Sequence, residues 1–422
     1  MKYADKNVLI ISHNPLSRVN NNGKTLVSIF KGFPEENIYQ IYLNVDVPDY
    51  SKESHYLQIN EIQIIKSIFK MKNLCCKEVE ATPGDVYSAT VKGRNFANHT
   101  KRLLRECIWK FAFWKYGLKD WLKDKSFDVV FFMAGDGLFA YDVYREVLNS
   151  VSAKCCVFFT DDYIIGKTSK SPVALLRRSL LKQKMKKTLR FTKDLYVISE
   201  EMRRSYHEIF HIDGYVIRNF SVEKKETAEE KQSDVQTDCL TMVYAGGVHY
   251  NRWKVLAQIA NALKALNESN DRKCYLKIYS SQNISDEIVD AINIEGASVF
   301  CGGASASQIA EIYAGADILL HVESFDKKAI ASTKYSFSTK IPEYMSAGKC
   351  VLAVGPAEVA SIRYLADFAC VINDNELLFS VLKKLINDRE YRNSIKTNCE
   401  KYYEKDFSKD KQKECLERIL SV

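Results

Sequence analysis

The chain has few of the features that mark membrane, fibrous or disordered proteins. Its 422 residues include only 7 prolines and 17 glycines. No apolar run approaches the roughly 18 residues that span a bilayer. The apolar run that starts at Val8 stops before His13, so it is too short for a signal peptide and predicts a first buried strand. With 46% hydrophobic and 27% charged residues, the sequence predicts a globular protein of two domains of about 200 residues each.

The chain also lacks any CxxC spacing, although it has 12 cysteines. They occur singly or as the adjacent pairs Cys75-Cys76 and Cys155-Cys156, several of them inside apolar runs. This pattern fits poorly with a zinc site or a disulfide framework and predicts reduced, buried thiols. We therefore expect a cytoplasmic protein without a metal site.

Short apolar runs alternate with stretches of helical periodicity, notably 23–32, 137–149, 173–190 and 200–210. Strands are expected at 7–12, 38–43, 127–133, 154–160 and 195–199 in the first half, and at 240–246, 275–280, 298–300, 317–322 and 350–354 in the second. Such alternation predicts parallel sheets with helices on both faces, and hence an α/β fold of two facing Rossmann-like domains. Ligands bind at the carboxyl ends of the strands in such sheets, so the active site is expected in a cleft between the domains.

Domain boundaries follow from a change in composition after residue 220. The segment 221–239 is polar and has no aromatic residue, which predicts a linker or an exposed loop. We expect an N-terminal domain over 1–220 and a C-terminal domain that starts at residue 240.

A possible phosphate-binding loop lies early in the chain, where 21–25 reads Asn-Asn-Gly-Lys-Thr. A P-loop needs a further glycine five residues before Gly23, and that position is Arg18. We interpret the segment as a flexible strand-to-helix turn rather than an ATPase site.

Gly246 and Gly247 follow the first strand of the second half and precede a helix whose first turn carries Arg252. Paired glycines allow close approach of the backbone to a ligand, and a helix N-terminus offers free N–H groups to an anion. Paired glycines after a strand are also common without any ligand, so this feature alone is compatible with a purely structural turn.

The most informative segment is 338–356. Ser338, Thr339 and Lys340 begin a helix that carries Glu343, and a glycine, a buried strand and a Gly-Pro turn follow. We interpret the hydroxyls and Lys340 as ligands of phosphate oxygens, and Glu343 as an acceptor for the hydroxyls of a ribose. The alternative is that Glu343 only satisfies backbone donors at the helix start.

This segment, KIPEYMSAGKCVLAVGP, resembles the donor-site motif of the family-4 group of retaining glycosyltransferases, whose fold is GT-B. YAGGVHYNRWKVL and VIRNF resemble two further motifs of that family, in the same order and spacing. The resemblance covers about 190–400 and implies a nucleotide-sugar-binding domain over 240–405, a helix at 406–422 that crosses back, and an acceptor-binding domain over 1–220. It further implies that Gly246 is the turn glycine, Arg252 binds the diphosphate, Glu343 binds the ribose, and no metal or other cofactor is needed.

Two positions depart from the family pattern. Tyr335 stands where the first glutamate of the family's glutamate pair is expected, and Gly247 replaces an arginine. Glu323, at the end of a predicted strand, is our candidate to replace the missing carboxylate.

In the first half, Asp136 and the pair Asp161-Asp162 follow predicted strands, as does His13. Strand carboxyl ends are where ligand-binding residues belong. We predict Asp136 as a catalytic residue together with Arg252 and Glu323. Asp161-Asp162 has the wrong spacing for a metal-binding Asp-x-Asp motif, and His13 is interpreted as a wall residue.

Two segments are strongly basic. Ten lysines and arginines occupy 167–193 without an acidic residue, and Leu176, Leu180 and Leu189 are expected on a shared face. In 101–121 basic residues alternate with aromatic ones. We predict peripheral contact with an anionic membrane, with a solvated helix face as the alternative. No nucleic-acid-binding motif accompanies these charges, so no nucleic acid is expected.

The function implied is transfer of a sugar from a nucleoside-diphosphate sugar to a hydroxyl, with retention of anomeric configuration. The resemblance implies a glycan or lipid-linked glycan acceptor, in the synthesis of bacterial capsule, lipopolysaccharide or exopolysaccharide. A nucleotide-sugar epimerase of the same fold, or a catalytically degenerate partner subunit, is the alternative.

Overall fold

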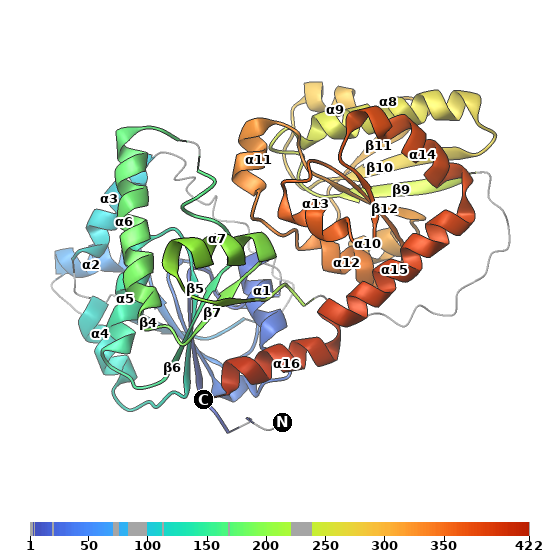
Figure 1. Ribbon diagram of the computed structural model, residues 1–422. Helices are drawn as coiled ribbons and strands as arrows, with labels where there is room; N and C mark the ends of the chain where they lie inside the picture. The colour runs from blue at the N-terminus through green and yellow to red at the C-terminus, as the bar shows by residue number, and fades with distance from the viewer. Residues whose placement is uncertain are drawn as a thin grey trace. The chain divides into compact units, whose positions relative to one another are not determined.

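The computed structural model describes Tyr3 and residues 5–18, 21–70, 76–82, 99–111, 114–167, 169–220 and 239–421 (Figure 1). The chain divides into two compact units. Unit 1 comprises Met1–Ile217 and Gln412–Val422, and unit 2 comprises Arg218–Lys411. The predicted linker 221–239 lies outside the described residues except for Cys239, which opens the first strand of unit 2.

Unit 1 is built on an eight-stranded sheet of order β4-β3-β2-β1-β5-β6-β7-β8. All neighbours are parallel except β3 and β4. The strands are β1 (Val8–Ser12), β2 (Ile38–Tyr42), β3 (His55–Ile59), β4 (Cys76–Val79), β5 (Val129–Ala134), β6 (Lys154–Phe159), β7 (Asp194–Val197) and β8 (Gly214–Val216). The helices are α1 (Asn21–Ile29), α2 (Glu61–Lys70), α3 (His99–Trp109), α4 (Trp114–Leu122), α5 (Leu138–Leu148), α6 (Pro172–Leu189) and α7 (Glu200–Phe210), with the last helix, α16 (Lys409–Leu420), bridging the division.

Unit 2 contains a six-stranded parallel sheet of order β11-β10-β9-β12-β13-β14. Its strands are β9 (Cys239–Ala245), β10 (Lys273–Tyr279), β11 (Ser298–Gly302), β12 (Ile318–Val322), β13 (Cys350–Val354) and β14 (Cys370–Ile372). Its helices are α8 (Arg252–Ser269), α9 (Asp286–Ile292), α10 (Ala306–Ala314), α11 (Lys327–Thr333), α12 (Lys340–Ser346), α13 (Ala360–Leu365), α14 (Leu378–Asn387) and α15 (Arg389–Phe407).

The predicted α/β class and the two Rossmann-like sheets are confirmed. Strands β1, β5, β12 and β13 are buried along their whole length, as expected of parallel strands covered on both faces. Helix ends follow local chemistry: the Ser199 hydroxyl accepts a hydrogen bond from the Met202 N–H at the start of α7, and Gly348, with φ of 61°, follows the end of α12.

The basic segment 167–193 differs from its prediction, because acidic residues from other elements neutralise part of it. Arg177 is 7% exposed and forms ion pairs with Asp136 and Glu106, while Lys184 pairs with Asp142. The predicted leucine face is also wrong. Leu176 and Leu180 are exposed, whereas Leu189 is buried in the core.

The aromatic residues of 101–121 are mostly core rather than surface. Trp109, Trp114 and Trp121 are buried, and each indole N–H has a hydrogen-bond acceptor, as buried indoles require. Phe111 and Tyr116 are exposed, and Phe113 lies outside the described residues.

Cys107, Cys239 and Cys301 are free thiols, as predicted, but they are exposed, so their predicted burial is wrong. No helix in the described part of the chain combines the length and apolarity needed to cross a membrane.

Candidate active site

The strand order of unit 2 reverses direction between β9 and β12. Chain order runs outward from β9 to β10 and β11 on one side, and from β12 to β13 and β14 on the other. In open parallel sheets such a switch point leaves a crevice at the carboxyl ends of the two central strands, and ligands bind there. Gly246 and Gly247 follow β9 at this point, and Glu323 follows β12.

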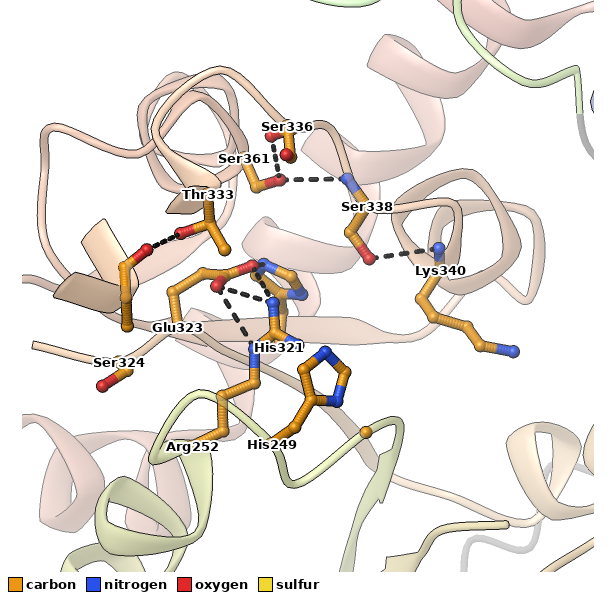
Figure 2. Close-up of polar contacts among 12 residues, drawn as sticks. His249, Arg252, His321, Glu323, Ser324, Thr333, Ser336, Ser338, Lys340 and Ser361 are labelled. Atoms are coloured by element: carbon orange, nitrogen blue, oxygen red, sulfur yellow. Dashed lines mark hydrogen bonds and ion pairs between the residues drawn. The ribbon is translucent and has the colours of Figure 1, made fainter. Parts of the chain in front are cut away.

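Arg252 and Glu323 bridge the switch point of unit 2 (Figure 2). Arg252 Nη2 lies 2.8 Å from Glu323 Oε2 and 3.0 Å from Oε1, and Arg252 Nε lies 3.2 Å from Oε2. The side chains are 16% and 5% exposed, so this is a nearly buried pair. Gly355 leaves room for it, because a Cβ there would lie 2.8 Å from Glu323 Cβ.

The electrostatics of the pair keep both groups charged. Burial alone would raise the pKa of Glu323, but His321 and the charge of Arg252 outweigh it, so the pKa is lowered. Burial would likewise lower the pKa of Arg252, and Glu323 reverses this, so that pKa is raised. His321 Nε2 lies 3.5 Å from Glu323 Oε1 and has no hydrogen-bond partner among the described residues, which makes His321 an electrostatic neighbour of the carboxylate rather than a bonded one.

The loop between β9 and α8 depends on both glycines. A Cβ on Gly246 would lie 2.8 Å from the Tyr244 hydroxyl, which donates a hydrogen bond to the Gly247 carbonyl. A Cβ on Gly247 would lie 2.5 Å from His249 Nδ1. A larger residue at either position would therefore displace the Tyr244 hydroxyl or the His249 ring, which gives a structural reason for the paired glycines.

The predicted phosphate and ribose ligands lie together around the start of α12. The Ser338 N–H donates to Ser361 Oγ at 3.0 Å, and the Lys340 N–H donates to Ser338 Oγ at 3.3 Å. Thr339 is the N-cap residue, although its side chain makes no capping hydrogen bond. Lys340 Nζ lies 3.1 Å from Glu343 Oε2, so the two form a pair within the first turn of α12.

Helix α12 is anchored to the end of β9 by the residue that follows Glu343. The Tyr344 hydroxyl lies 3.4 Å from both the backbone N and the carbonyl O of Ala245, immediately before Gly246. The Lys340–Glu343 pair is separate from the Arg252–Glu323 pair, and Figure 2 shows Lys340 extending away from the latter. Tyr335, at the expected glutamate position, is 6% exposed, so Glu323 is the carboxylate that the structure places at the switch point.

Unit 1 has its own switch point, between β1 and β5, and Asp136 lies there. Asp136 forms ion pairs with Arg102 and, at 3.5 Å, with Arg177 Nη1. Arg177 also donates to the Asp136 carbonyl, and its Nη2 lies 3.5 Å from Glu106 Oε1. Two arginines from α3 and α6 thus fix the carboxylate of Asp136, which remains 41% exposed.

His13 lies at the same edge, just after β1. Burial and the nearby charge of Arg105 lower the pKa of His13 to about 4, so this imidazole is neutral at pH 7.

The pair Asp161-Asp162 serves the backbone instead of a ligand. Asp162 is 2% exposed, and its carboxylate accepts hydrogen bonds from the N–H groups of Ile164, Ile165 and Gly166. Within the described residues no group of three or more His, Cys, Asp or Glu side chains is placed to hold a metal ion.

Sequence reasoning missed three residues at the switch point of unit 2: His249, Gln282 and His321. His321 lies inside a buried strand, where its neighbours suggest only core. Gln282 meets His249 across 33 positions of sequence because β10 is paired with β9, so only knowledge of the strand order would have found it.

Comparison with solved structures adds the decisive observation on the fold. HepE of Anabaena in complex with UDP superposes with a TM-score of 0.63 at 11% identity, covering 98% of each chain. The chain has the GT-B fold. The trehalose-6-phosphate protein of E. coli bound with UDP-2-fluoro glucose gives a TM-score of 0.63 at 11% identity, covering 99% of each chain. A trehalose-6-phosphate synthase, analysed with bisubstrate glycomimetics for enzymatic glycosyl transfer with retention, gives a TM-score of 0.63 at 11% identity and covers 98% of this chain and 99% of its own.

No family model and no curated protein matches the sequence. At 11% identity the structural likeness concerns the fold alone.

Proposed function

We propose that this chain is a glycosyltransferase that moves a sugar from a nucleoside-diphosphate sugar to a hydroxyl acceptor. The observation that carries the proposal is the guanidinium of Arg252 at the switch point of unit 2, beside a glycine loop and a helix start. A cation at this place suits a diphosphate, because it acts on the negative charge that grows on the leaving group. Solved proteins of the same fold hold UDP or a UDP-sugar, which supports uridine diphosphate as the first ligand to test.

In this proposal the diphosphate takes the place of Glu323 at Arg252. The backbone N–H of Gly247, together with Ser338, Thr339 and Lys340, completes the set of phosphate ligands, and Glu343 accepts hydrogen bonds from the ribose hydroxyls. Gly246 contributes as the turn glycine, because its own N–H donates to the Tyr279 carbonyl at 3.0 Å. Glu323, released from Arg252, then serves as the carboxylate facing the donor sugar. No cofactor takes part.

We propose transfer with retention, in which the chain supplies no strong base. The new bond joins the acceptor oxygen to the anomeric carbon while the bond from that carbon to the diphosphate oxygen breaks, and the acceptor proton passes to the departing oxygen. Asp136, oriented by Arg102 and Arg177, is the proposed hydrogen-bond acceptor for the acceptor hydroxyl. The low pKa of His13 makes it too weak a base for this step at pH 7.

The proposed acceptor is a lipid-linked glycan in the synthesis of bacterial capsule, lipopolysaccharide or exopolysaccharide, so we also propose peripheral attachment to an anionic membrane. Its support is the outer side of α6. Leu175, Leu176 and Leu180 are exposed there beside a group of exposed basic residues, Lys182, Lys186, Lys187 and Arg190. Each basic residue close to an anionic leaflet contributes about 1 kcal/mol of attraction.

Sedimentation with vesicles tests the attachment. We expect binding to anionic vesicles at low salt and release at 1 M salt, where the Debye length falls to about 3 Å. Replacing Lys182, Lys186, Lys187 and Arg190 with glutamine should abolish binding, and Arg177 is left intact because it is buried. The matched control replaces four exposed lysines of unit 2: Lys264, Lys277, Lys383 and Lys401. Equal loss in the control, or no binding by the wild type at low salt, would refute the α6 surface.

Nucleotide binding and turnover test the activity itself. A thermal-shift series with UDP, GDP, ADP and CDP should single out one nucleotide, since a ligand at 100 times its Kd stabilises the fold by about 2.7 kcal/mol. Turnover of the matching nucleotide sugar should require an acceptor. Release of free nucleoside diphosphate together with an epimerised sugar, without any acceptor, would instead identify an epimerase, and binding without turnover would indicate a degenerate partner subunit.

A further inference from the structure

The loop between β9 and α8 is held by one side chain from another strand, Gln282, which lies just after β10. Gln282 Oε1 accepts hydrogen bonds from the N–H of Val248 at 2.8 Å and of His249 at 3.3 Å. A backbone N–H can only donate, so these two bonds fix which end of the amide is oxygen. The amide nitrogen, Nε2, therefore faces the other way, where it lies 2.6 Å from His249 Nδ1.

This contact determines the tautomer of His249. An amide NH2 group can only donate, so His249 Nδ1 must be the acceptor and carries no hydrogen. The ring proton of the neutral imidazole is then on Nε2, the nitrogen turned away from Gln282. The charged groups that face His249 among the described residues are Arg252 at the start of α8 and Glu323 after β12, and burial with the charge of Arg252 lowers the pKa of His249, which keeps the ring neutral.

The contact between His249 and Gln282 depends on the glycine at position 247. A Cβ at Gly247 would lie 2.5 Å from His249 Nδ1 and 3.0 Å from Gln282 Nε2. A side chain at 247 would displace the His249 ring or the Gln282 amide from this contact. Gly247, His249 and Gln282 thus form one unit, which we call the histidine bracket.

The histidine bracket lies beside the proposed diphosphate-binding cation. His249 lies in the loop three residues before Arg252, which begins α8, and Figure 2 shows its ring next to the Arg252 guanidinium. We propose that the Nε2–H of His249 donates a hydrogen bond to a phosphoryl oxygen of the bound nucleoside diphosphate, with Gln282 as the positioning residue that fixes the tautomer. This proposal rests on the function proposed above. A neutral donor is suited to this place because a second cation would repel Arg252 in the free protein, where Glu323 neutralises only one charge.

Two substitutions at His249 separate the donor from the loop contact. Asparagine can still accept from Gln282 but cannot reach the Nε2 position, whereas glutamine brings an amide N–H to it. We expect His249→Asn to raise the Kd for UDP, measured by calorimetry, by about 10- to 150-fold, the range for a hydrogen bond to a charged group. His249→Gln should recover most of this loss. The control, His207→Asn, changes an exposed histidine of α7 in unit 1 and should bind as the wild type does.

Gln282→Glu tests the tautomer itself without changing the size of the side chain. The new carboxylate still accepts from the backbone N–H groups, but its second oxygen requires a proton on His249 Nδ1. The neutral ring then has no Nε2–H, while the imidazolium has both protons. In this variant the new carboxylate raises the pKa of His249, so UDP affinity should fall as pH rises through that raised pKa. The wild-type affinity should change little over pH 6.5–9.

Nitrogen-15 NMR of the imidazole reads the tautomer directly, with or without nucleotide. The proposal expects the Nε2–H form in the wild type and the Nδ1–H form or imidazolium in Gln282→Glu. An Nδ1–H wild type, or wild-type UDP affinity in His249→Asn, would overturn the histidine bracket alone. If the wild type bound no nucleoside diphosphate at all, the proposed function would fall together with this inference.

Discussion

Replacing Glu323 with glutamine removes one charge of the Arg252–Glu323 pair and leaves its shape almost unchanged. In the free protein the carboxylate holds the guanidinium through three contacts of 2.8–3.2 Å. In the proposed function the same carboxylate leaves Arg252 when a diphosphate binds to it. The substitution should therefore lower the stability of the free protein and raise its affinity for UDP, two effects that an uninvolved residue would not show together.

The magnitude follows from the burial of the pair. Two unit charges about 4 Å apart attract by about 4 kcal/mol at an effective dielectric constant of 20. Removing one partner of a buried pair costs about 3–5 kcal/mol, and glutamine keeps one acceptor worth about 1 kcal/mol. We expect a loss of about 2–4 kcal/mol in the free energy of unfolding of unit 2, or a fall in Tm of about 4–16 °C for a domain of this size.

The gain in affinity comes from the same free energy. If binding breaks the pair fully in the wild type, a pair worth about 2 kcal/mol corresponds to about 30-fold tighter UDP binding in the variant. Turnover should fall, because Glu323 is the proposed carboxylate for the donor sugar. Scanning calorimetry and titration calorimetry on Glu323→Gln measure both quantities. A wild-type Tm with unchanged or weaker UDP binding would refute the competition.

The pH dependence provides a second check on Glu323. Its folded pKa is lowered, so its contribution to stability is present above the unfolded value of about 4.3 and is lost as pH falls through the folded pKa. Glu323→Gln should lack this part of the loss of stability at low pH. An identical fall of the free energy of unfolding at low pH in both proteins would contradict the role given to Glu323.

Four further predictions use independent measurements. Glu343→Ala should raise the Kd for UDP by about 10- to 150-fold, since a hydrogen bond to a charged group is worth roughly 1.5–3 kcal/mol, and an unchanged Kd would remove the ribose assignment. Arg252→Ala should lower kcat more than it raises KM, because charge grows on the leaving diphosphate; a change in KM alone would reduce the residue to an anchor. Because the pKa of His13 is lowered to about 4 in the folded state, wild-type stability should fall by up to about 3 kcal/mol as pH drops from 6.5 to 4, and His13→Gln should flatten that limb in urea titrations. EDTA should leave turnover intact, and loss of activity restored by manganese would show that a metal is needed.

The sequence predicted the central strands well because they are the buried ones. β1, β5, β12 and β13 are almost entirely apolar, with Ser12 and His321 as the polar exceptions, and a near-continuous apolar run is typical of parallel strands covered on both faces. β4, with the sequence CKEV and two exposed residues, has no such run and was missed at the sheet edge. β14 has only three residues, which are too few to show a hydrophobic pattern in the sequence.

The candidate site was predictable only where one short segment carried it. Arg252 and Glu343 were found from their places after a glycine pair and within a helix start. Gln282 and His321 were not, because their partners, His249 and Glu323, meet them through strand register or inside a buried strand, and polar contacts of this kind leave no local pattern.

Counting charged residues along the sequence misjudges the local charge of the folded protein. Arg177 belongs to a basic run, yet in space it meets Asp136 and Glu106, which come 41 and 71 positions earlier. Arg252 is likewise neutralised by Glu323 from another strand. The net charge of +8 therefore says little about the attraction of either switch point for an anion. In the proposed function, a diphosphate that reaches Arg252 exchanges one counter-ion for another. Its affinity would then be set by the difference between two ion pairs and by the proposed neutral donor His249.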